Sequence, residues 1–172
     1  MFCIEKYFEY FLSFEKKKIL NTFVTKKNIN ELVNNFYSKN EEIDCISIDV
    51  DGNDYFLMEA INFMPKLIII EYNFWLGKEK SITIPYQEDY SWDGNIYSGA
   101  SLLVLNNLAN KKNYSLIAID SSCTNAFFIR NDLAHNFSIL DPIKSFKIPK
   151  KYNNNDLSLA KKYLENKSFI NI

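Results

Sequence analysis

The sequence IDCISIDVDGND, residues 43–54, is the stretch that decides the fold. It begins with a short β-branched run around Ile46 and Ile48, which predicts a buried strand over residues 43–50. Asp51 and Gly52 then end the strand, because both residue types accept the backbone conformations of a tight turn. Residues 54–62 carry apolar side chains at helical spacing, which predicts a helix directly after the turn.

The sequence LIIIEYN, residues 67–73, begins with the most apolar run of the chain. A short apolar run bounded by polar residues predicts a central parallel strand that is buried on both faces. Two later runs, 115–119 and 126–129, predict an antiparallel pair joined by residues 120–125. Alternating strands and helices therefore predict an α/β fold with a mostly parallel open sheet and an antiparallel last strand.

Weaker signals predict the remaining elements. Four helices are predicted: one over residues 2–16, one that begins at Asn28, one over 98–111 and one that ends at residue 164. A strand is predicted over 19–25 and a long loop over 74–97. Asn28 followed by Glu31 predicts a capping box, and Asp156 is predicted to cap the last helix after an asparagine-rich linker over 153–155. We expect one α/β domain over residues 1–140 and a C-terminal extension over residues 141–172.

Composition excludes several classes of protein. Lysine and arginine total 20 against 21 aspartates and glutamates, which argues against a nucleic-acid partner. The three cysteines are far apart and in no metal-ligand spacing, so we expect a reducing compartment, and Cys45 is predicted to be a small core residue. No apolar run reaches the ~18 residues of a membrane span. Residues 1–6 lack the apolar stretch of a signal peptide, so we expect a cytoplasmic protein.

Several polar residues fall at the predicted carboxyl ends of strands, where open α/β sheets bind their ligands. These residues are Thr25, Asp49, Asp51, Glu71, Asn73 and Asp120. Two aspartates two residues apart can hold a divalent cation, or one of them can act as a base. Asp49, Asp51, Glu71 and Asn73 together could form an oxygen-rich magnesium site, but we assign none of them as a metal ligand from the sequence. The alternative is an ordinary turn, since aspartate, glycine and asparagine are the residues with which a chain usually leaves a strand.

Three known metal motifs compete for this stretch. A calcium-binding loop starting at Asp49 is excluded, because Asp54 and Ala60 stand where glycine and glutamate are needed. A haloacid dehalogenase-like phosphatase begins with an Asp-x-Asp-Gly strand end, as here, and is kept as an alternative. It also needs a lysine and a second acidic pair, and the strand ending at Asp120 offers only one acid. A nucleotide-sugar transferase site would rest on two aspartates alone.

Six blocks of sequence carry a further resemblance. They lie, in this order, at 23–32, 43–55, 70–73, 82–86, 97–102 and 125–128. Together they resemble a group of bacterial proteins related to the FkbM-like methyltransferases. The resemblance implies a Rossmann-like fold that uses S-adenosylmethionine, commonly for O-methylation, and hence a small-molecule or saccharide substrate.

The resemblance also implies that part of the fold is missing. Methyltransferases of this fold hold their donor in a glycine-rich turn after the first strand, whereas the first glycine here is Gly52. The segments before Asn28 match the second helix and the third strand, so the first two strands are expected to be absent. We therefore expect a truncated methyltransferase-like protein that is weak or inactive alone. The alternative is a non-catalytic assembly piece that complements another chain or forms a homo-oligomer.

Roles follow for the candidate residues. Asp51 is the predicted catalytic base, and Asp49 is predicted to position the acceptor, a metal or the cofactor. By the resemblance, Thr25 is expected near the adenine of the cofactor. Residues 97–101 are predicted to open a helix whose free N–H groups receive substrate, unless Ser98 simply caps that helix. The expected substrate-binding residues are Glu71, Tyr72, Asn73, Tyr97, Ser98, Gly99 and Asn125.

Overall fold

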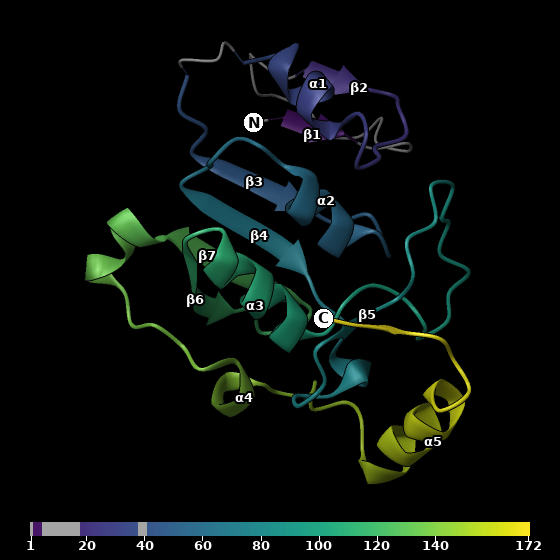
Figure 1. Ribbon diagram of the computed structural model, residues 1–172. Helices are drawn as coiled ribbons and strands as arrows, with labels where there is room; N and C mark the ends of the chain where they lie inside the picture. Colours follow the sequence, from purple (N-terminus) through teal and green to yellow (C-terminus); the bar gives the residue numbers. More distant parts are fainter. Residues whose placement is uncertain (1, 5–17, 38–40) are drawn as a thin grey trace.

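The computed structural model describes residues 2–4, 18–37 and 41–172, and its centre is a four-stranded sheet (Figure 1). The strands lie in the order β3 (Cys45–Ile48), β4 (Leu67–Glu71), β7 (Asn125–Arg130) and β6 (Tyr114–Ile119). β3 and β4 are parallel, whereas β7 is antiparallel to both of its neighbours. The α/β class and the antiparallel pair are confirmed. Because β7 is antiparallel to both β4 and β6, the strands β3, β4 and β6 run in one direction and β7 in the other, as predicted for a mostly parallel sheet with an antiparallel last strand.

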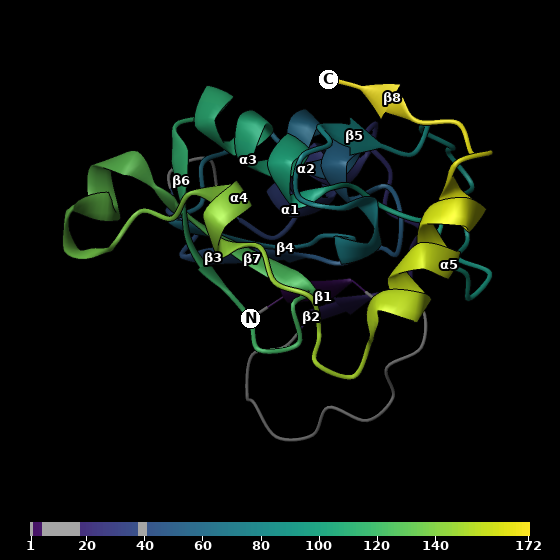
Figure 2. The same cartoon turned by 90° about the horizontal axis from the view of Figure 1, so that it is seen from below.

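Helices α2 (Asp54–Ala60) and α3 (Leu102–Lys111) lie on the same face of this sheet (Figure 2). Ile70 of β4 and Phe128 of β7 have no exposed surface, and they form one core with Leu57 of α2 and Leu105 of α3. The removal of this apolar surface from water is the main stabilising contribution to the fold.

The strand β3 is buried on one face only. Cys45 and Ser47 are exposed, whereas Ile48 is buried, as expected for side chains that alternate between the two faces of a strand. Within the four-stranded sheet, β3 has a strand neighbour on one side only. The prediction that Cys45 is a core residue is therefore wrong, because its apolar run forms an edge strand rather than a doubly buried one.

Two short strands precede the first described helix. β1 (Phe2–Ile4) and β2 (Lys18–Leu20) form a separate parallel pair, and α1 spans Ile29–Asn34. The helix predicted over 2–16 is wrong for residues 2–4, and its remainder lies outside the described residues. Three residues are too few for apolar spacing to distinguish a strand from a helix. The strand predicted over 19–25 ends already at Leu20.

Asn28 occupies the N-cap position of α1 but makes no capping hydrogen bond. Its Oδ1 accepts from the Thr25 N–H at 2.7 Å, and its Nδ2 donates to the Phe23 carbonyl at 2.9 Å. The predicted capping box is therefore wrong. Asn28 instead holds the loop between β2 and α1 against the start of the helix.

Helix α3 begins at Leu102 rather than at Ser98, because Ser101 is extended and Gly99 has a left-handed φ of 58°. Ser101 N–H donates to the Ile82 carbonyl, and the Gly99 carbonyl accepts from Ile84 N–H. This pairs residues 99–101 with β5 (Ile82–Thr83) and its neighbour. The capping residue is Ser101, whose Oγ accepts from Val104 N–H at 3.2 Å.

Ser101→Ala is expected to lower the free energy of unfolding by roughly 1–2 kcal/mol, because the fully buried Oγ would no longer cap α3. The same Oγ also donates to the Lys80 carbonyl at 2.6 Å. Ser98→Ala is the matched control, since no hydrogen bond of the Ser98 hydroxyl is found among the described residues. Urea unfolding compares the two, and an equal loss in both would contradict this cap.

The C-terminal segment packs against the rest of the chain. Its elements are α4 (Pro142–Ser145), α5 (Asn154–Leu164) and β8 (Ile170–Asn171). Earlier in the chain, η1 (Phe74–Leu76) and η2 (Asn131–Asn136) are 3₁₀ helices. Leu164 packs on Leu76 and Ile82, and β8 pairs with β5. Asn153, not Asp156, is the N-cap of α5, and the two side chains form a capping box. The predicted linker over 153–155 is thus the first turn of a helix.

Candidate functional site

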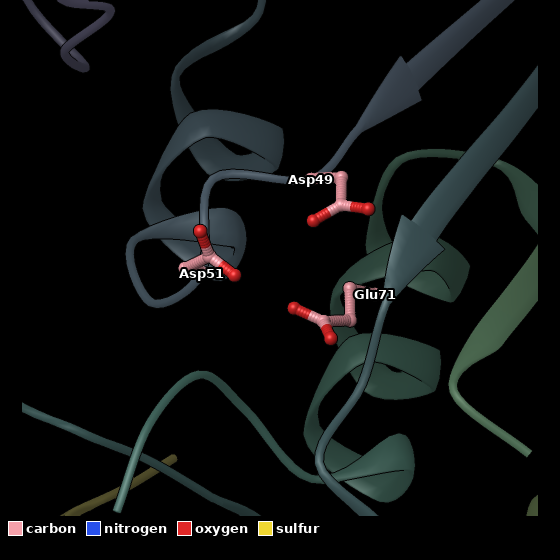
Figure 3. A group of neighbouring side chains, drawn as sticks. All are labelled: Asp49, Asp51 and Glu71. Atoms are coloured by element: carbon pink, nitrogen blue, oxygen red, sulfur yellow. The ribbon is translucent and has the colours of Figure 1, made fainter. Parts of the chain in front are cut away.

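Three carboxylates meet where β3 and β4 end (Figure 3). Asp49 directly follows β3, Asp51 lies in the next turn, and Glu71 is the last residue of β4. In Figure 3 the three side chains point toward a common space. One oxygen atom from each lies within 4.8 Å of the others, so one cation could contact all three. The structure therefore brings together three of the residues that the sequence singled out.

The strand register explains why Asp49 and Glu71 are neighbours. Ile48 pairs with Ile70 in the parallel ladder, so the next residue of each strand leaves the sheet at the same level. Side chains alternate along a strand, and Glu71 therefore points to the face opposite the buried Ile70. Once the two strands are paired, the position of each residue along its strand determines the face of the sheet to which its side chain points.

The turn after β3 carries Asp51 into the same space. Asp51 has a φ of 61°, in the left-handed region that aspartate tolerates better than most residues. The Asp54 carboxylate closes the turn from inside, accepting from Val50 N–H at 3.0 Å and from Gly52 N–H at 2.9 Å. Asp54 is only 1% exposed, and sequence reasoning gave it no part in the site.

Asp51→Gly is expected to leave the protein about 1 kcal/mol more stable than Asp51→Ala. Both changes remove the carboxylate, so their difference isolates the left-handed backbone at this position. Glycine adopts that conformation without a steric cost, whereas alanine does not. Urea unfolding of both variants measures the difference, and an alanine variant as stable as the glycine variant would contradict the turn geometry.

The surroundings of the site disfavour the charged forms of its own carboxyl groups. Burial, together with the charges of Asp54, Asp49 and Asp51, raises the pKa of Glu71 from 4.5 to about 8. Burial and the charge of Asp51 also raise the pKa of Asp49. Burial raises the pKa of Asp54 from 3.8 to about 7, against backbone hydrogen bonds that favour its anion. Protons or a cation are therefore favoured in this space near neutral pH.

An aromatic side chain covers the acidic turn. A Cβ atom added to Gly52 would lie 2.2 Å from Cε1 of the Tyr90 ring, so the ring rests directly on this glycine. The Tyr90 hydroxyl donates to the Tyr97 carbonyl at 3.2 Å. Burial and nearby negative charges, those of Asp51 and Asp54 among them, raise the pKa of Tyr90 to about 12. Sequence reasoning missed Tyr90, because it lies in a long loop without periodic signal.

Two further contacts attach the same loop to the site and to α1. Asn53 Nδ2 donates to the Gln87 carbonyl at 2.7 Å, next to the acidic turn. Lys27 Nζ, in the segment before α1, forms an ion pair at 2.6 Å with Glu88, the residue after Gln87. Two adjacent residues of the loop over residues 85–97 are thus tied by polar contacts, one to the acidic turn and one to the segment before α1.

Two predicted site residues have their polar groups engaged in structural contacts. Asn125 is the register partner of Glu71, but its Nδ2 donates to Asp120 Oδ2 at 3.2 Å. Asn73 Nδ2 donates to the carbonyls of Ile96 and Ser98, both at 2.8 Å, and its Oδ1 accepts from Trp75 N–H. Asn73 therefore fixes the backbone after the covering loop.

Tyr72 follows Glu71 on the chain, so its side chain points to the opposite face of the sheet. It is 1% exposed, and its hydroxyl has no hydrogen-bond partner among the described residues. Its backbone N–H donates to the Thr124 carbonyl at 2.7 Å. The structure thus separates Tyr72 from the three carboxylates.

The remaining predicted residues lie in loops, where local backbone contacts determine their positions. Tyr97 N–H donates to Asn95 Oδ1 at 2.6 Å, and Gly99 has a φ of 58°. Since α3 starts at Leu102, residues 97–101 do not offer the helix N-terminus that the sequence suggested for Ser98 and its neighbours. Thr25 is buried, and its Oγ1 accepts from Lys27 N–H at 3.3 Å within the loop before α1.

The carboxylates fit a hard divalent cation, because Asp49, Asp51 and Glu71 offer the oxygen ligands that magnesium and calcium prefer. The described residues do not fit the cradle of S-adenosylmethionine. That cradle needs a glycine at which the backbone approaches the ligand, and Gly52 is covered by Tyr90. The other glycines of the chain, Gly77, Gly94 and Gly99, have positive φ in loops.

Comparisons of the sequence with protein-family models, with curated proteins and with solved structures found no match. The resemblance to FkbM-like methyltransferases therefore stays a prediction.

Proposed function

We propose that this chain is a methyltransferase-like α/β protein whose carboxylate site binds the hydroxyl of a methyl acceptor. The observation that carries the proposal is the convergence of Asp49, Asp51 and Glu71 at the carboxyl ends of two parallel strands. Ligands of open α/β sheets bind beyond such strand ends. A small hydroxylated molecule such as a saccharide is the acceptor class that these oxygen atoms suit.

Methyl transfer to a hydroxyl requires one residue that removes the hydroxyl proton and others that hold the acceptor. Methyl transfer to a hydroxyl requires that its proton leaves as the new bond forms, and a carboxylate beside the acceptor can take it. The pKa of Glu71 is raised to about 8, near the pH at which a general base is most effective. We therefore assign the base to Glu71 in place of Asp51. Asp51 and Asp49 then hold the acceptor, directly or through a cation.

The donor implied by the resemblance is S-adenosylmethionine, which would supply a sulfonium-bound methyl group. The described residues form no glycine-rich cradle for it, so we expect these 172 residues to bind it weakly by themselves. A complementing chain would then supply the cradle.

The test is transfer of a tritiated methyl group from S-adenosylmethionine, at high donor concentration, to a panel of hydroxylated small molecules and saccharides. We expect slow transfer that is lost in Glu71→Gln and retained in Glu79→Gln, a change at an exposed glutamate outside the site. Equal transfer by Glu71→Gln, or absence of transfer together with absence of calorimetric binding of every acceptor, would contradict the proposal.

The same carboxylates support a second candidate, a magnesium-dependent phosphatase that uses the Asp-x-Asp-Gly strand end. The supporting observation is that Glu71 adds a third oxygen ligand to Asp49 and Asp51. Hydrolysis of p-nitrophenyl phosphate with and without magnesium separates this candidate from the first. Magnesium-dependent turnover that disappears in Asp49→Asn would favour the phosphatase.

A third candidate is an assembly piece that complements another chain. It is supported by the position of β3, which has a strand neighbour on only one side of its four-stranded sheet. An unpaired strand edge is a template for pairing with another chain. Light scattering of the purified protein over a range of concentrations tests self-association, and a monomer throughout would oppose a homo-oligomer.

A further inference from the structure

Residues 137–152, which we call the strap, connect η2 to α5 along the lower side of the molecule in Figure 1. Leu140, Phe146 and Tyr152 of the strap pack against the main core. The Leu140 N–H also donates to the Leu116 carbonyl of β6 at 2.8 Å. The strap is therefore held in place at intervals along its length.

Beside these anchors the strap presents apolar side chains to solvent. Phe137 is 48% exposed, Ile139 55%, Ile143 40% and Ile148 36%. Single exposed apolar residues are common on protein surfaces, but four within one short anchored segment are not. Their exposure leaves an apolar surface that the described residues do not cover.

The strap is also basic, although the whole chain has a net charge of -1. It contains four lysines, Lys144, Lys147, Lys150 and Lys151, against the single acid Asp141. All four lysines are exposed. Asp141 is occupied as the cap of α4, where its Oδ1 accepts from the N–H groups of Ile143 and Lys144, both at 2.9 Å.

We propose that the strap is a surface that binds peripherally to an anionic lipid bilayer. Binding of a protein segment at a membrane surface grows with the apolar area that it buries there and with its electrostatic attraction to anionic lipids, and the strap offers both exposed apolar side chains and lysines. Lysines near the surface are attracted by anionic headgroups, and Ile143 and Ile148 enter the boundary between headgroups and acyl chains. No helix in the described ranges is long and apolar enough to cross a bilayer.

Charge complementarity alone would also suit a nucleic acid, but the strap lacks the other features of such a site. It contains no arginine, and its exposed apolar residues are mostly isoleucines, which cannot stack on bases. Aliphatic side chains beside lysines match a bilayer, because lysines can contact the anionic headgroups while the aliphatic side chains contact the acyl chains.

The test is co-sedimentation of the full chain with phosphatidylcholine vesicles, with and without phosphatidylserine. We expect binding only to the anionic vesicles and weaker binding as salt is raised. Each lysine near an anionic surface strengthens binding roughly fivefold, so Lys147→Gln with Lys150→Gln should weaken it roughly 25-fold. Ile143→Ser with Ile148→Ser should weaken it roughly tenfold.

The matched control is Lys78→Gln with Lys80→Gln, which removes two exposed lysines outside the strap. Circular dichroism melting verifies that each variant is folded. Equal loss of vesicle binding in the control and in the strap variants would overturn the proposal. Absence of binding to anionic vesicles would overturn it as well, and retardation of a DNA duplex at the same salt concentration would then identify a nucleic acid as the partner.

Discussion

Glu71→Gln is expected to stabilise the protein at pH 8 by roughly 2–4 kcal/mol while leaving its stability at pH 4 nearly unchanged. Glutamine resembles the protonated form of glutamate. In the folded protein, burial and three neighbouring aspartates raise the pKa of Glu71 from 4.5 to about 8. At pH 8 the folded wild-type chain therefore carries either a destabilised carboxylate or a proton that the unfolded chain would have released, and either lowers its stability. The variant has no proton to lose at this position.

The sign follows from the proton balance. Between pH 4.5 and about 8 the folded state holds the Glu71 proton more tightly than the unfolded state does, so wild-type stability falls as pH rises through this range. Asp54 acts in the same direction, with a pKa raised from 3.8 to about 7. The difference between the variant and the wild type should therefore grow with pH.

Urea unfolding at several pH values in buffer with a chelator measures this effect. Glu79→Gln serves as the control, because Glu79 is exposed and should show no pH-dependent gain. A Glu71→Gln variant that is less stable than the wild type at pH 8 would mean that the Glu71 carboxylate has a favourable partner. The electrostatic description of the site would then be wrong.

Gly52→Ala is expected to destabilise the protein by roughly 1–3 kcal/mol, because the new methyl group would lie 2.2 Å from the Tyr90 ring. Either the ring or the acidic turn must then move. Since Asp51 is the adjacent residue, the change is also expected to weaken whatever the three carboxylates bind. Thermal unfolding measures the first effect.

A second substitution shows whether the ring is the cause. Tyr90→Ala removes the clash, so the double variant should lose less stability than the two single changes added together. Gly99→Ala is the matched control, because Gly99 has a φ of 58° with open space around it. Its cost comes from the backbone and should not depend on Tyr90. Additive losses for Gly52→Ala and Tyr90→Ala would contradict the contact.

The sequence predicted the parts of the site that follow from strand ends. The β-branched run before Asp49 and the apolar run before Glu71 define two strands, and parallel pairing of consecutive strands brings their carboxyl ends together. Asp51 follows from the same turn. These residues were accessible because local composition and strand parity determine their positions.

Other features depend on contacts between distant segments, which a single sequence does not reveal. Tyr90 covers Gly52 from a loop without periodicity. Ser101 caps α3 because residues 99–101 pair with the segment around β5, which delays the helix. Cys45 is exposed because β3 lies at an edge of its sheet, although its sequence reads as a buried strand.

The most direct test of the central claim is the pKa of the Glu71 carboxyl group, followed by carbon-13 NMR and assigned with the Glu71→Gln variant. The shared carboxylate site predicts a pKa of about 8 that falls when Asp49 and Asp51 are both replaced by asparagine. A pKa near the ordinary 4.5 that does not respond to these replacements would show that the three carboxylates do not share one site.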